Sequence, residues 1–470
     1  PYYDQRIDYN ISLSVLDAIK KNISDSNTRY LMLISEGSDG LDIIKYLLTL
    51  ENRKYTELIG SRFKSDNKSG RYTDEVSNKI KYKMESDTIL ILKDLDIIYP
   101  SLYDLFNQSF ITMGDKKFAR ISFEYAKISS EVNKDFHIIV LVNNNQIKNL
   151  KLDPPFLNRF EKHIIDFNIL LDEYDREIAK NIYDYIQLIS SFNNNPNLKI
   201  DLDNLLINCK KNNIEGLIFK IKNNKNYKLI KNEDIESEEY KDNLIKEVFN
   251  IIVPTFCQDI ILSVVNSGIK PKKYNDMVID IYKKSVHPNI SSFINNMKKR
   301  KNIIYTFSKI TDDIFEQDYS IENKNIIKDF DAFNKENCSI EMIESIKSEE
   351  NLVFKLKSFT DSENKKILIL KFSEKDLNKI ISINYVINSF EEENPEFKKK
   401  YVIFMIHKQR RLKKKDDNYE QEEQQDLITF FNDDYYQIFI DNLNGKENLD
   451  IIHIMERNKD IFTEHYINYI

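Results

Sequence analysis

Glycine is scarce in this chain of 470 residues, which contains only 8 of them where ordinary usage of about 7 % would give roughly 33. Any chemistry that depends on a glycine-rich phosphate loop must therefore be tested against eight positions. Tryptophan is absent, so 28 phenylalanines and 27 tyrosines supply all the aromatic side chains. The hydrophobic content of 41 % still allows large buried cores and excludes a globally disordered chain.

Clustered cysteines and long apolar runs are also lacking. The three cysteines, Cys209, Cys257 and Cys338, lie far apart, which excludes a disulfide framework and a cysteine-based zinc module and fits a reducing compartment. The six histidines do not cluster, so we expect no metal site. No run approaches the ~20 apolar residues of a membrane span, and no signal peptide opens the chain. We expect a cytoplasmic protein and, since the first residue is Pro1 rather than Met, a piece of a longer one.

The charges favour no nucleic-acid partner. The chain has 69 basic and 76 acidic side chains and a net charge of −7, whereas a nucleic-acid surface would give a basic domain. A basic run over residues 408–415 is followed by an acidic, glutamine-rich run over 416–426. Such charge blocks are typical of solvated loops and, less often, of interaction elements.

Four short apolar runs predict the buried strands of a parallel sheet in the first third of the chain. They cover residues 29–34, 56–60, 88–92 and 136–142. Segments with helical spacing separate them, so we predict a doubly wound α/β unit over residues 1–170.

The remaining pattern predicts a helical segment and then a second α/β unit. Apolar residues recur at helical spacing from about Asp172, which predicts a helical, lid-like subdomain over 171–298. Strand-like runs return at 302–307, 366–371 and 401–406 and predict the second α/β unit over 299–446. A helical segment over 447–470 would end the chain.

An α/β unit followed by helices is the outline of an AAA+ module, so nucleotide machinery should follow the first and third strands. The turn after the first strand contains Gly37 and Gly40, acidic side chains and no lysine. A phosphate loop needs a lysine beside its backbone amides. The turn is therefore a degenerate version of that loop, and an ordinary strand-to-helix turn explains it well.

The residues after the third strand also depart from the active pattern. An active unit has Asp-Glu here to hold magnesium and to polarise the attacking water. This chain has Lys93 at the magnesium-side position and Asp94 at the position of the glutamate. A cation there would displace the metal. Alternatively, Asp94 and Asp96 cap a helix that begins near Tyr99.

Two further positions are candidates for nucleotide chemistry. Asn143 ends the fourth strand, where AAA+ modules often place a sensor of the γ-phosphate, although a run of asparagines also makes a good turn. Arg159 follows two prolines, and we predict it at the start of a short helix. In ring ATPases an arginine at this place stabilises the transition state on the neighbouring unit's nucleotide. The alternative is an ion pair with Glu161 or Asp166 that fixes the loop.

The second α/β unit departs further from the pattern of an active nucleotide-binding unit, and we predict that it binds no nucleotide. Its first strand continues into residues 308–313 without a glycine. The strand over 366–371, which corresponds to the third strand of the first unit, ends at Lys371, Phe372, Ser373 and Glu374, which contain no Asp-Glu pair.

Several of these motifs together resemble one family. The run from Thr88 to Gln108, the strand at 136–140 and the segment Pro155-Phe-Leu-Asn-Arg-Phe-Glu-Lys-His163 are similar to the mysterin family of giant AAA+ ubiquitin ligases of the RING class. Weaker similarity continues through 304–309, 384–388 and 431–442. The resemblance implies a dynein-like core of six AAA units in one polypeptide. Two of those units hydrolyse ATP, and this chain resembles the degenerate units that follow them.

The resemblance also implies a role for the segment. We expect it to hydrolyse no ATP, to complete the preceding unit's ATP site with Arg159 as an arginine finger, and to relay that unit's state to the ligase module. ATP and magnesium would bind to the neighbouring unit and not here. The parent would be an ATPase and ubiquitin-protein transferase, whose partners are a ubiquitin-conjugating enzyme and substrates. The alternative is a protein-interaction scaffold with no coupling to ATP.

Overall fold

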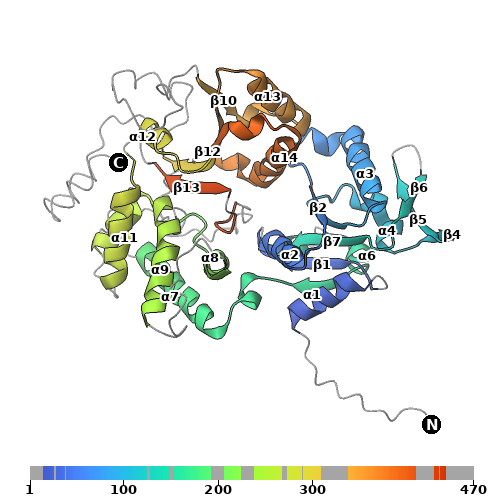
Figure 1. The fold of residues 1–470 in the computed structure, drawn as a ribbon, viewed down its shortest axis with the longest axis horizontal. Coiled ribbons are helices and arrows are strands. Elements are labelled where there is room, and N and C mark those ends of the chain that lie inside the picture. Colours follow the sequence, from blue (N-terminus) through green and yellow to red (C-terminus); the bar gives the residue numbers. More distant parts are fainter. Residues whose placement is uncertain are drawn as a thin grey trace, which may run out of the picture. The chain divides into compact units, whose positions relative to one another are not determined.

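The computed structural model describes residues 14–25, 28–37, 39–123, 127–148, 152–191, 206–223, 238–266, 272–287, 289–307, 337–408, 428–432 and 434–440. The chain forms two compact units, residues 1–170 and 171–470 (Figure 1). The charged run beyond Lys408 and the helical segment predicted over 447–470 lie outside the described residues. No helix in the described part of the chain combines the length and the apolarity that a membrane crossing needs.

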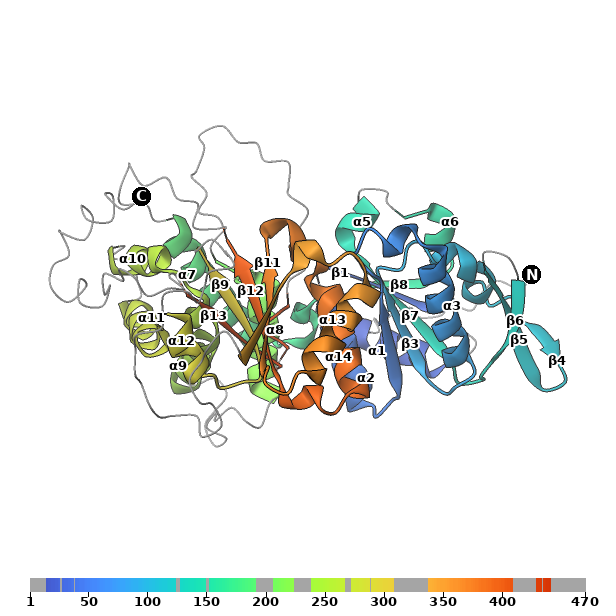
Figure 2. The ribbon, with the colours of Figure 1, turned by 90° about the horizontal axis from the view of Figure 1, so that it is seen from above.

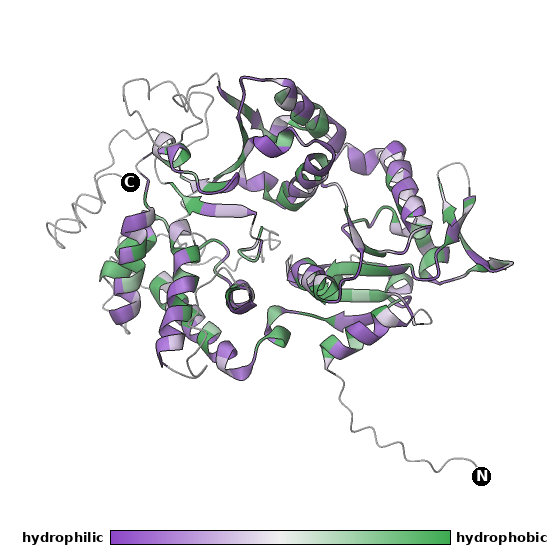
Figure 3. Cartoon of the chain, viewed as in Figure 1, coloured by the Kyte–Doolittle hydropathy of each residue, from purple (hydrophilic) through white to green (hydrophobic). Residues whose placement is uncertain are grey.

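A five-stranded parallel sheet forms the core of the first unit. Its strands are β1 (Leu31–Ser35), β2 (Tyr55–Ile59), β3 (Ile89–Lys93), β7 (His137–Asn143) and β8 (Glu161–Ile164), in the order β2-β3-β7-β1-β8. The α/β fold and its four predicted strands are confirmed. All residues of β1 and β3 are buried, which explains why both are continuous apolar runs (Figure 3).

Helices cover both faces of this sheet. They are α1 (Val15–Ser24), α2 (Asp39–Leu50), α3 (Gly70–Met84), α4 (Tyr103–Phe106), α5 (Asn144–Lys148) and α6 (Pro154–Leu157). The crossover through α2 leads outward to the edge strand β2, and the crossover through α3 leads back to β3. Right-handed crossovers in opposite directions place α2 and α3 on opposite faces, as Figure 2 shows.

A small antiparallel sheet is inserted between α4 and β7, which the sequence analysis did not predict. It contains β4 (Ile111–Met113), β5 (Lys116–Ser122) and β6 (Lys127–Val132). Ala119 and Ile121 of β5 are fully buried, whereas β4 is exposed along its length. The inserted sheet therefore packs on the unit through one face.

A buried polar network attaches α1 to the amino ends of β1, β7 and β8. The Asn22 amide nitrogen donates to the Arg29 carbonyl at 2.9 Å and to Glu161 Oε2 at 2.7 Å. Asn22 Oδ1 lies 3.0 Å from His137 Nε2. Since Oδ1 can only accept, Nε2 carries the proton of this buried histidine. His137 is therefore a hydrogen-bonded core residue.

The second unit begins with helices. They are α7 (Glu173–Ser191), α8 (Lys211–Asn223), α9 (Glu238–Ile252), α10 (Gln258–Asn266), α11 (Lys272–Ser285) and α12 (Ile290–Asn295). The parallel sheet that follows has the strands β9 (Lys301–Thr306), β10 (Cys338–Met342), β11 (Ile367–Phe372), β12 (Tyr401–His407) and β13 (Tyr435–Phe439). The helices α13 (Glu349–Asp361) and α14 (Ile380–Glu393) connect its strands.

Both sheets have the same topology. The second has the order β10-β11-β12-β9-β13, so in each sheet the strands follow the order second, third, fourth, first, fifth along the chain. The three predicted strands of the second unit are confirmed, and β10 and β13 are additional. The second unit therefore repeats the architecture of the first.

Buried hydrogen bonds join the turn before α8 to the sheet of the second unit. Asn208 donates to the Ile428 carbonyl at 2.9 Å and to Gln437 Oε1 at 3.2 Å. The Tyr305 hydroxyl donates to the same Gln437 oxygen at 3.0 Å. The segments predicted over 171–298 and 299–446 thus lie in one compact unit.

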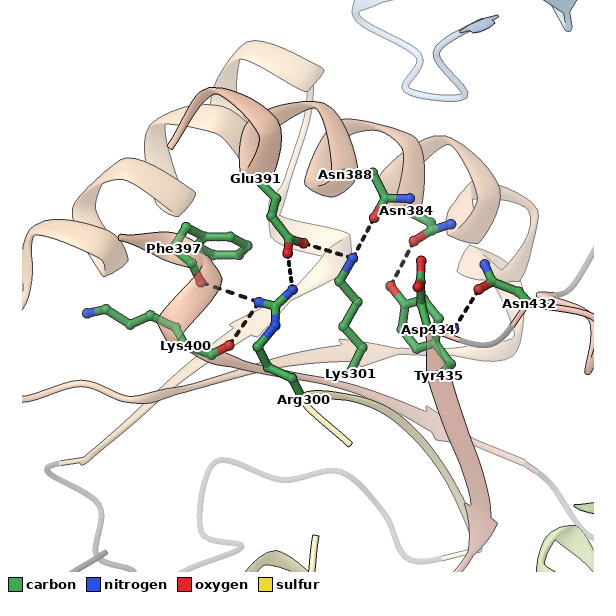
Figure 4. A network of polar contacts seen from close by, with 10 residues as sticks. All are labelled: Arg300, Lys301, Asn384, Asn388, Glu391, Phe397, Lys400, Asn432, Asp434 and Tyr435. Atoms are coloured by element: carbon green, nitrogen blue, oxygen red, sulfur yellow. Dashed lines mark hydrogen bonds and ion pairs between the residues drawn. The ribbon is translucent and has the colours of Figure 1, made fainter. Parts of the chain in front are cut away.

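A charged network closes the amino edge of the second sheet (Figure 4). Glu391 of α14 receives a hydrogen bond from Arg300 and lies 2.8 Å from Lys301 Nζ, which also donates to Asn388 at 2.7 Å. Burial acts to raise the pKa of Glu391, but the hydrogen bonds and charges of Arg300 and Lys301 hold it below its ordinary value. The amino edge of this sheet is therefore filled by its own ion pairs.

Candidate functional site

The carboxyl edge of the first sheet brings together the turn after β1 and the end of β3. Gly37 has φ +60°, a conformation that favours glycine. Gly40 donates its N–H to Ser35 Oγ at 3.2 Å, and a Cβ at Gly40 would lie 2.5 Å from that oxygen. Gly37 therefore has a conformational reason at its position and Gly40 a packing reason, with or without a phosphate.

Lys93 lies at the end of β3, and its side chain points to this turn. Its ammonium is 3.5 Å from the Gly37 carbonyl oxygen and 3.9 Å from Asp94 Oδ2, and the residue is only 4 % exposed. Asp94 also pairs with Arg62 at 2.6 Å. Burial acts to raise the pKa of Asp94, but the charges of Lys93 and Arg62 outweigh it and lower the pKa. The group at the end of β3 is thus a buried ion cluster.

The interpretation of Asp94 as a helix cap is wrong. The helix in question is a 3₁₀ helix over Tyr99–Leu102, whose N-cap residue is Ile98 and has no side-chain cap. Asp94 instead has φ +58° and pairs with Arg62. A Cβ at Gly60 would lie 1.8 Å from the Asp94 carbonyl oxygen, so glycine is required where the β2 loop crosses this turn.

Asn143 is engaged in the turn that begins α5. Its N–H donates to Gln146 Oε1 at 2.9 Å, and its Oδ1 accepts the Asn145 N–H at 2.9 Å. This arrangement is typical of an asparagine that shapes a turn. These contacts favour the alternative that Asn143 shapes a turn. Its role as a sensor of the γ-phosphate stays a prediction.

Arg159 lies on the opposite edge of the sheet. It follows α6 instead of starting a helix, and it precedes β8, whose first residue Glu161 pairs in register with Leu31 at the start of β1. Its guanidinium donates to the Pro155 carbonyl, and Cζ lies 3.9 Å from the centre of the Tyr103 ring. Arg159 is thus held by its own loop and by a tyrosine that the sequence analysis did not single out.

The ion pairs considered for Arg159 are not present within the described residues. Glu161 instead binds His163 at 2.9 Å and Asn22 at 2.7 Å. Asp166 Oδ1 is buried without a hydrogen-bond partner among the described residues. The loop is therefore held by main-chain carbonyl contacts and ring stacking instead of a carboxylate.

The third strands of the two sheets share a residue pattern that the sequence analysis missed. Residues 89–93 and 367–371 both read Ile-Leu-Ile-Leu-Lys. Lys371 is 2 % exposed and, like Lys93, lies near the carboxyl end of the strand that comes third along the chain within its sheet. A search for internal repeats would have found this pentapeptide.

No group of three or more His, Cys, Asp or Glu residues among the described ones is arranged to hold a metal ion. The three cysteines are buried, and none of them forms a disulfide with another described residue. Burial raises the pKa of both Cys209 and Cys338 to about 12, so neither thiol is an activated nucleophile.

The comparisons with known proteins match the first unit. Residues 20–171 match the family model described as the RNF213 AAA domain. The chain is 24 % identical over 188 residues, 37 % of its length, to the E3 ubiquitin-protein ligase RNF213 of Homo sapiens, and 24 % identical over 185 residues to that of Mus musculus. It is 27 % identical over 176 residues to the E3 ubiquitin-protein ligase rnf213-beta of Danio rerio.

These matches cover about 4 % of the length of the human and mouse relatives and 3 % of the zebrafish one. The first unit is an RNF213-like AAA segment with the parallel α/β fold expected for it. RNF213 is mysterin, so the resemblance inferred from the motifs of the first unit is confirmed, whereas the weaker similarity over 304–442 stays a prediction.

Proposed function

We propose that this chain is a non-hydrolysing AAA segment of an RNF213-like ubiquitin ligase. In this proposal it packs in a dynein-like core of six units, completes the preceding unit's ATP site with Arg159 and relays the state of that site to the ligase module. The observation that carries the proposal is that two cationic side chains lie at opposite edges of one sheet. Lys93 lies at the carboxyl edge and Arg159 at the amino edge.

The carboxyl edge does not fit a magnesium nucleotide. An active P-loop unit holds the metal with an acidic residue after the third strand and the phosphates with a lysine after the first. Here the buried Lys93 ammonium is directed to the Gly37 carbonyl, so a divalent cation at this place would face a like charge in a medium that screens charge poorly. Glu36 and Asp39 add negative charge to the turn that would have to bind phosphate.

The amino edge supports a role in trans. A five-residue strand such as β1 spans roughly 16 Å, so Arg159 lies about that far from the unit's own carboxyl edge. An arginine side chain does not bridge this distance. The guanidinium of Arg159 is therefore available only to a phosphate that another unit carries.

The wider context follows from the likeness to RNF213. ATP and magnesium would bind at the neighbouring AAA unit of a longer cytoplasmic parent, and the parent would act as ATPase and ubiquitin-protein transferase. Its ubiquitin-conjugating enzyme and substrates would be partners of the parent rather than of this segment. Within the segment, the proposed contacts are with neighbouring AAA units and the ligase module.

One observation favours the alternative, a scaffold without coupling to ATP. The Arg159 guanidinium already contacts the Pro155 carbonyl and the Tyr103 ring. Hydrogen exchange separates the two functions. Protection of residues 153–163 should change with the nucleotide state of the parent if Arg159 senses it, and should stay constant in a scaffold.

The decisive variant is Arg159→Ala in the full-length parent, in a background where the other active unit has lost its magnesium-binding carboxylate. Removal of an arginine finger lowers turnover by about 10³-fold or more. We expect such a loss in ATP hydrolysis with ATP binding retained. Arg71→Ala is the matched control, because Arg71 is an exposed arginine paired with Glu75 on α3. Unchanged hydrolysis in Arg159→Ala would refute the proposal.

A further inference from the structure

Three cations donate to one turn of the first unit. Arg29 donates to the Asn158 carbonyl at 3.1 Å, Lys162 to the Leu157 carbonyl at 2.9 Å, and Arg159 to the Pro155 carbonyl. These carbonyls belong to the last turn of α6, where the helix dipole favours positive charge. Arg29 and Lys162 are exposed, whereas Arg159 is half-buried. The turn at residues 155–158 is thus surrounded by basic side chains.

Arg159 differs from the other two because an aromatic ring covers it. Its Cζ lies 3.9 Å from the centre of the Tyr103 ring, well within the range of a cation–π contact. The Tyr103 hydroxyl donates to Asp153 Oδ2 at 3.2 Å, which fixes the ring on the loop that carries Arg159. Tyr103 belongs to α4, so this contact joins α4 to the loop before β8.

The hydrogen-bonding capacity of Arg159 is only partly used. A guanidinium has five N–H donors, and the structure gives Arg159 one carbonyl acceptor. Its Nε is buried and has no hydrogen-bond partner among the described residues. A buried donor without an acceptor is unfavourable. A phosphate, which accepts two parallel hydrogen bonds from arginine, would satisfy donors that the loop leaves unused.

We infer that Tyr103 is a positioning residue that keeps Arg159 stacked against its own turn. Arg159 leaves this stack when a neighbouring unit brings the phosphate group of its nucleotide within reach. The inference rests on the proposed function, because it assigns the regulation of the same arginine. Arg29 and Lys162 remain on the turn and supply a positive field that favours the anion. The stacked and released positions make this arginine a two-state element.

The inference can be tested on this chain without any nucleotide. Phenylglyoxal reacts with accessible guanidinium groups, and mass spectrometry of peptides gives the labelling rate of each arginine. Arg71, whose side chain is 71 % exposed, is the internal reference. We expect Tyr103→Ala to raise the rate of Arg159 about two- to fivefold relative to Arg71, as the loss of an exposed cation–π contact implies. An unchanged ratio would overturn the inference.

Two variants separate stacking from a general loosening. Tyr103→Phe keeps the ring and should label like the wild type, so a rise equal to that of Tyr103→Ala would also overturn the inference. Tyr82→Ala removes a tyrosine that is 69 % exposed on α3 and should leave the Arg159 rate unchanged. Should Tyr103→Ala fail to fold, Tyr103→Leu replaces it, because leucine keeps apolar bulk but has no aromatic face.

The parent protein distinguishes failure of this inference from failure of the proposed function. If Arg159→Ala leaves ATP turnover unchanged, the proposed function fails, and the labelling result alone decides whether Tyr103 covers the arginine. If Arg159→Ala lowers turnover, release of the stack should raise it. Tyr103→Ala should then hydrolyse ATP about two- to fivefold faster than the wild type. Unchanged or slower turnover in Tyr103→Ala would refute the regulatory role and leave the arginine finger intact.

Discussion

At the scale of single residues, Lys93 determines what the carboxyl edge of the first sheet can do. Its ammonium is buried between the Gly37 carbonyl and the Asp94 carboxylate, and Asp94 is also paired with Arg62. A buried charge is tolerated only when it is paired and hydrogen-bonded. Lys93 and Asp94 were found from the sequence by their place after an apolar strand. The contact with Gly37 could not be predicted, since it depends on the shape of a turn elsewhere in the chain.

Reversal of the charge at position 93 should destabilise the first unit. Lys93→Glu places a carboxylate beside Asp94 and removes the cation that both the turn and Asp94 contact. We expect the free energy of unfolding to fall by about 3–5 kcal/mol, the usual effect of breaking a buried ion pair. Urea unfolding followed by circular dichroism measures it. Lys134→Glu, at a side chain that is 87 % exposed, should change the free energy by less than about 0.5 kcal/mol. Similar losses in both variants would contradict the buried pairing.

At the scale of elements, buried strands were predictable, whereas the exposed strands β4 and β8 were not. The strands β1, β3, β7, β11 and β12 are almost wholly buried, so their sequences are continuous apolar runs. In contrast, β8 is an edge strand whose residues Glu161 to Ile164 alternate between half-buried and exposed. Its polar sequence has no strand signature, and this led to the prediction of a short helix beginning at Arg159. The exposed strand β4 was missed for a similar reason.

The attachment of α1 to the sheet should make the first unit sensitive to acid. Burial of His137, together with the charge of Arg53, lowers its pKa to about 4, although Glu161 acts in the opposite direction. An unfolded histidine takes up its proton near pH 6.5, whereas the folded one resists it until about pH 4. The folded state therefore loses stability as the pH falls through this window, by about 3 kcal/mol in total.

Urea unfolding at pH 7.5 and pH 5 measures this effect. The wild type should lose about 2 kcal/mol between the two conditions, and His137→Phe should lose clearly less. Titration of Glu161 should not contribute to the stability change between pH 7.5 and pH 5. Burial acts to raise its pKa, but the hydrogen bonds from His163 and Asn22 lower it below the ordinary glutamate value, so its contribution is lost only at more acidic pH. An equal loss in wild type and variant would show that another group titrates.

At the scale of the whole molecule, the two units repeat one topology and one pentapeptide. Each sheet has its first strand between the fourth and the fifth, and each third strand has a buried lysine near its carboxyl end. The similarity of the units was predictable from the order of apolar runs. The repeated Ile-Leu-Ile-Leu-Lys sequence became meaningful only when the strand orders placed both copies at equivalent positions.

The complete chain should bind no magnesium nucleotide at micromolar concentrations. Titration calorimetry of all 470 residues with ATP and magnesium chloride examines both units in one experiment. We expect no saturable heat, because Lys93 lies where a metal would bind and the turn after β1 contains no lysine. A dissociation constant in the micromolar range would disprove the predicted absence of nucleotide binding for at least one of the units.

The contact between Lys93 and Gly37 has a thermodynamic consequence. A metal or a nucleotide occupies its site according to its concentration, and the state of such a site therefore reports the supply of the ligand. The charge that holds the Gly37 turn to β3 is part of the polypeptide and cannot dissociate. Neither a chelator nor a change in nucleotide concentration can therefore remove the contact between Lys93 and Gly37. If the unit binds no nucleotide of its own, as we propose, any signal that it passes on originates in its neighbours.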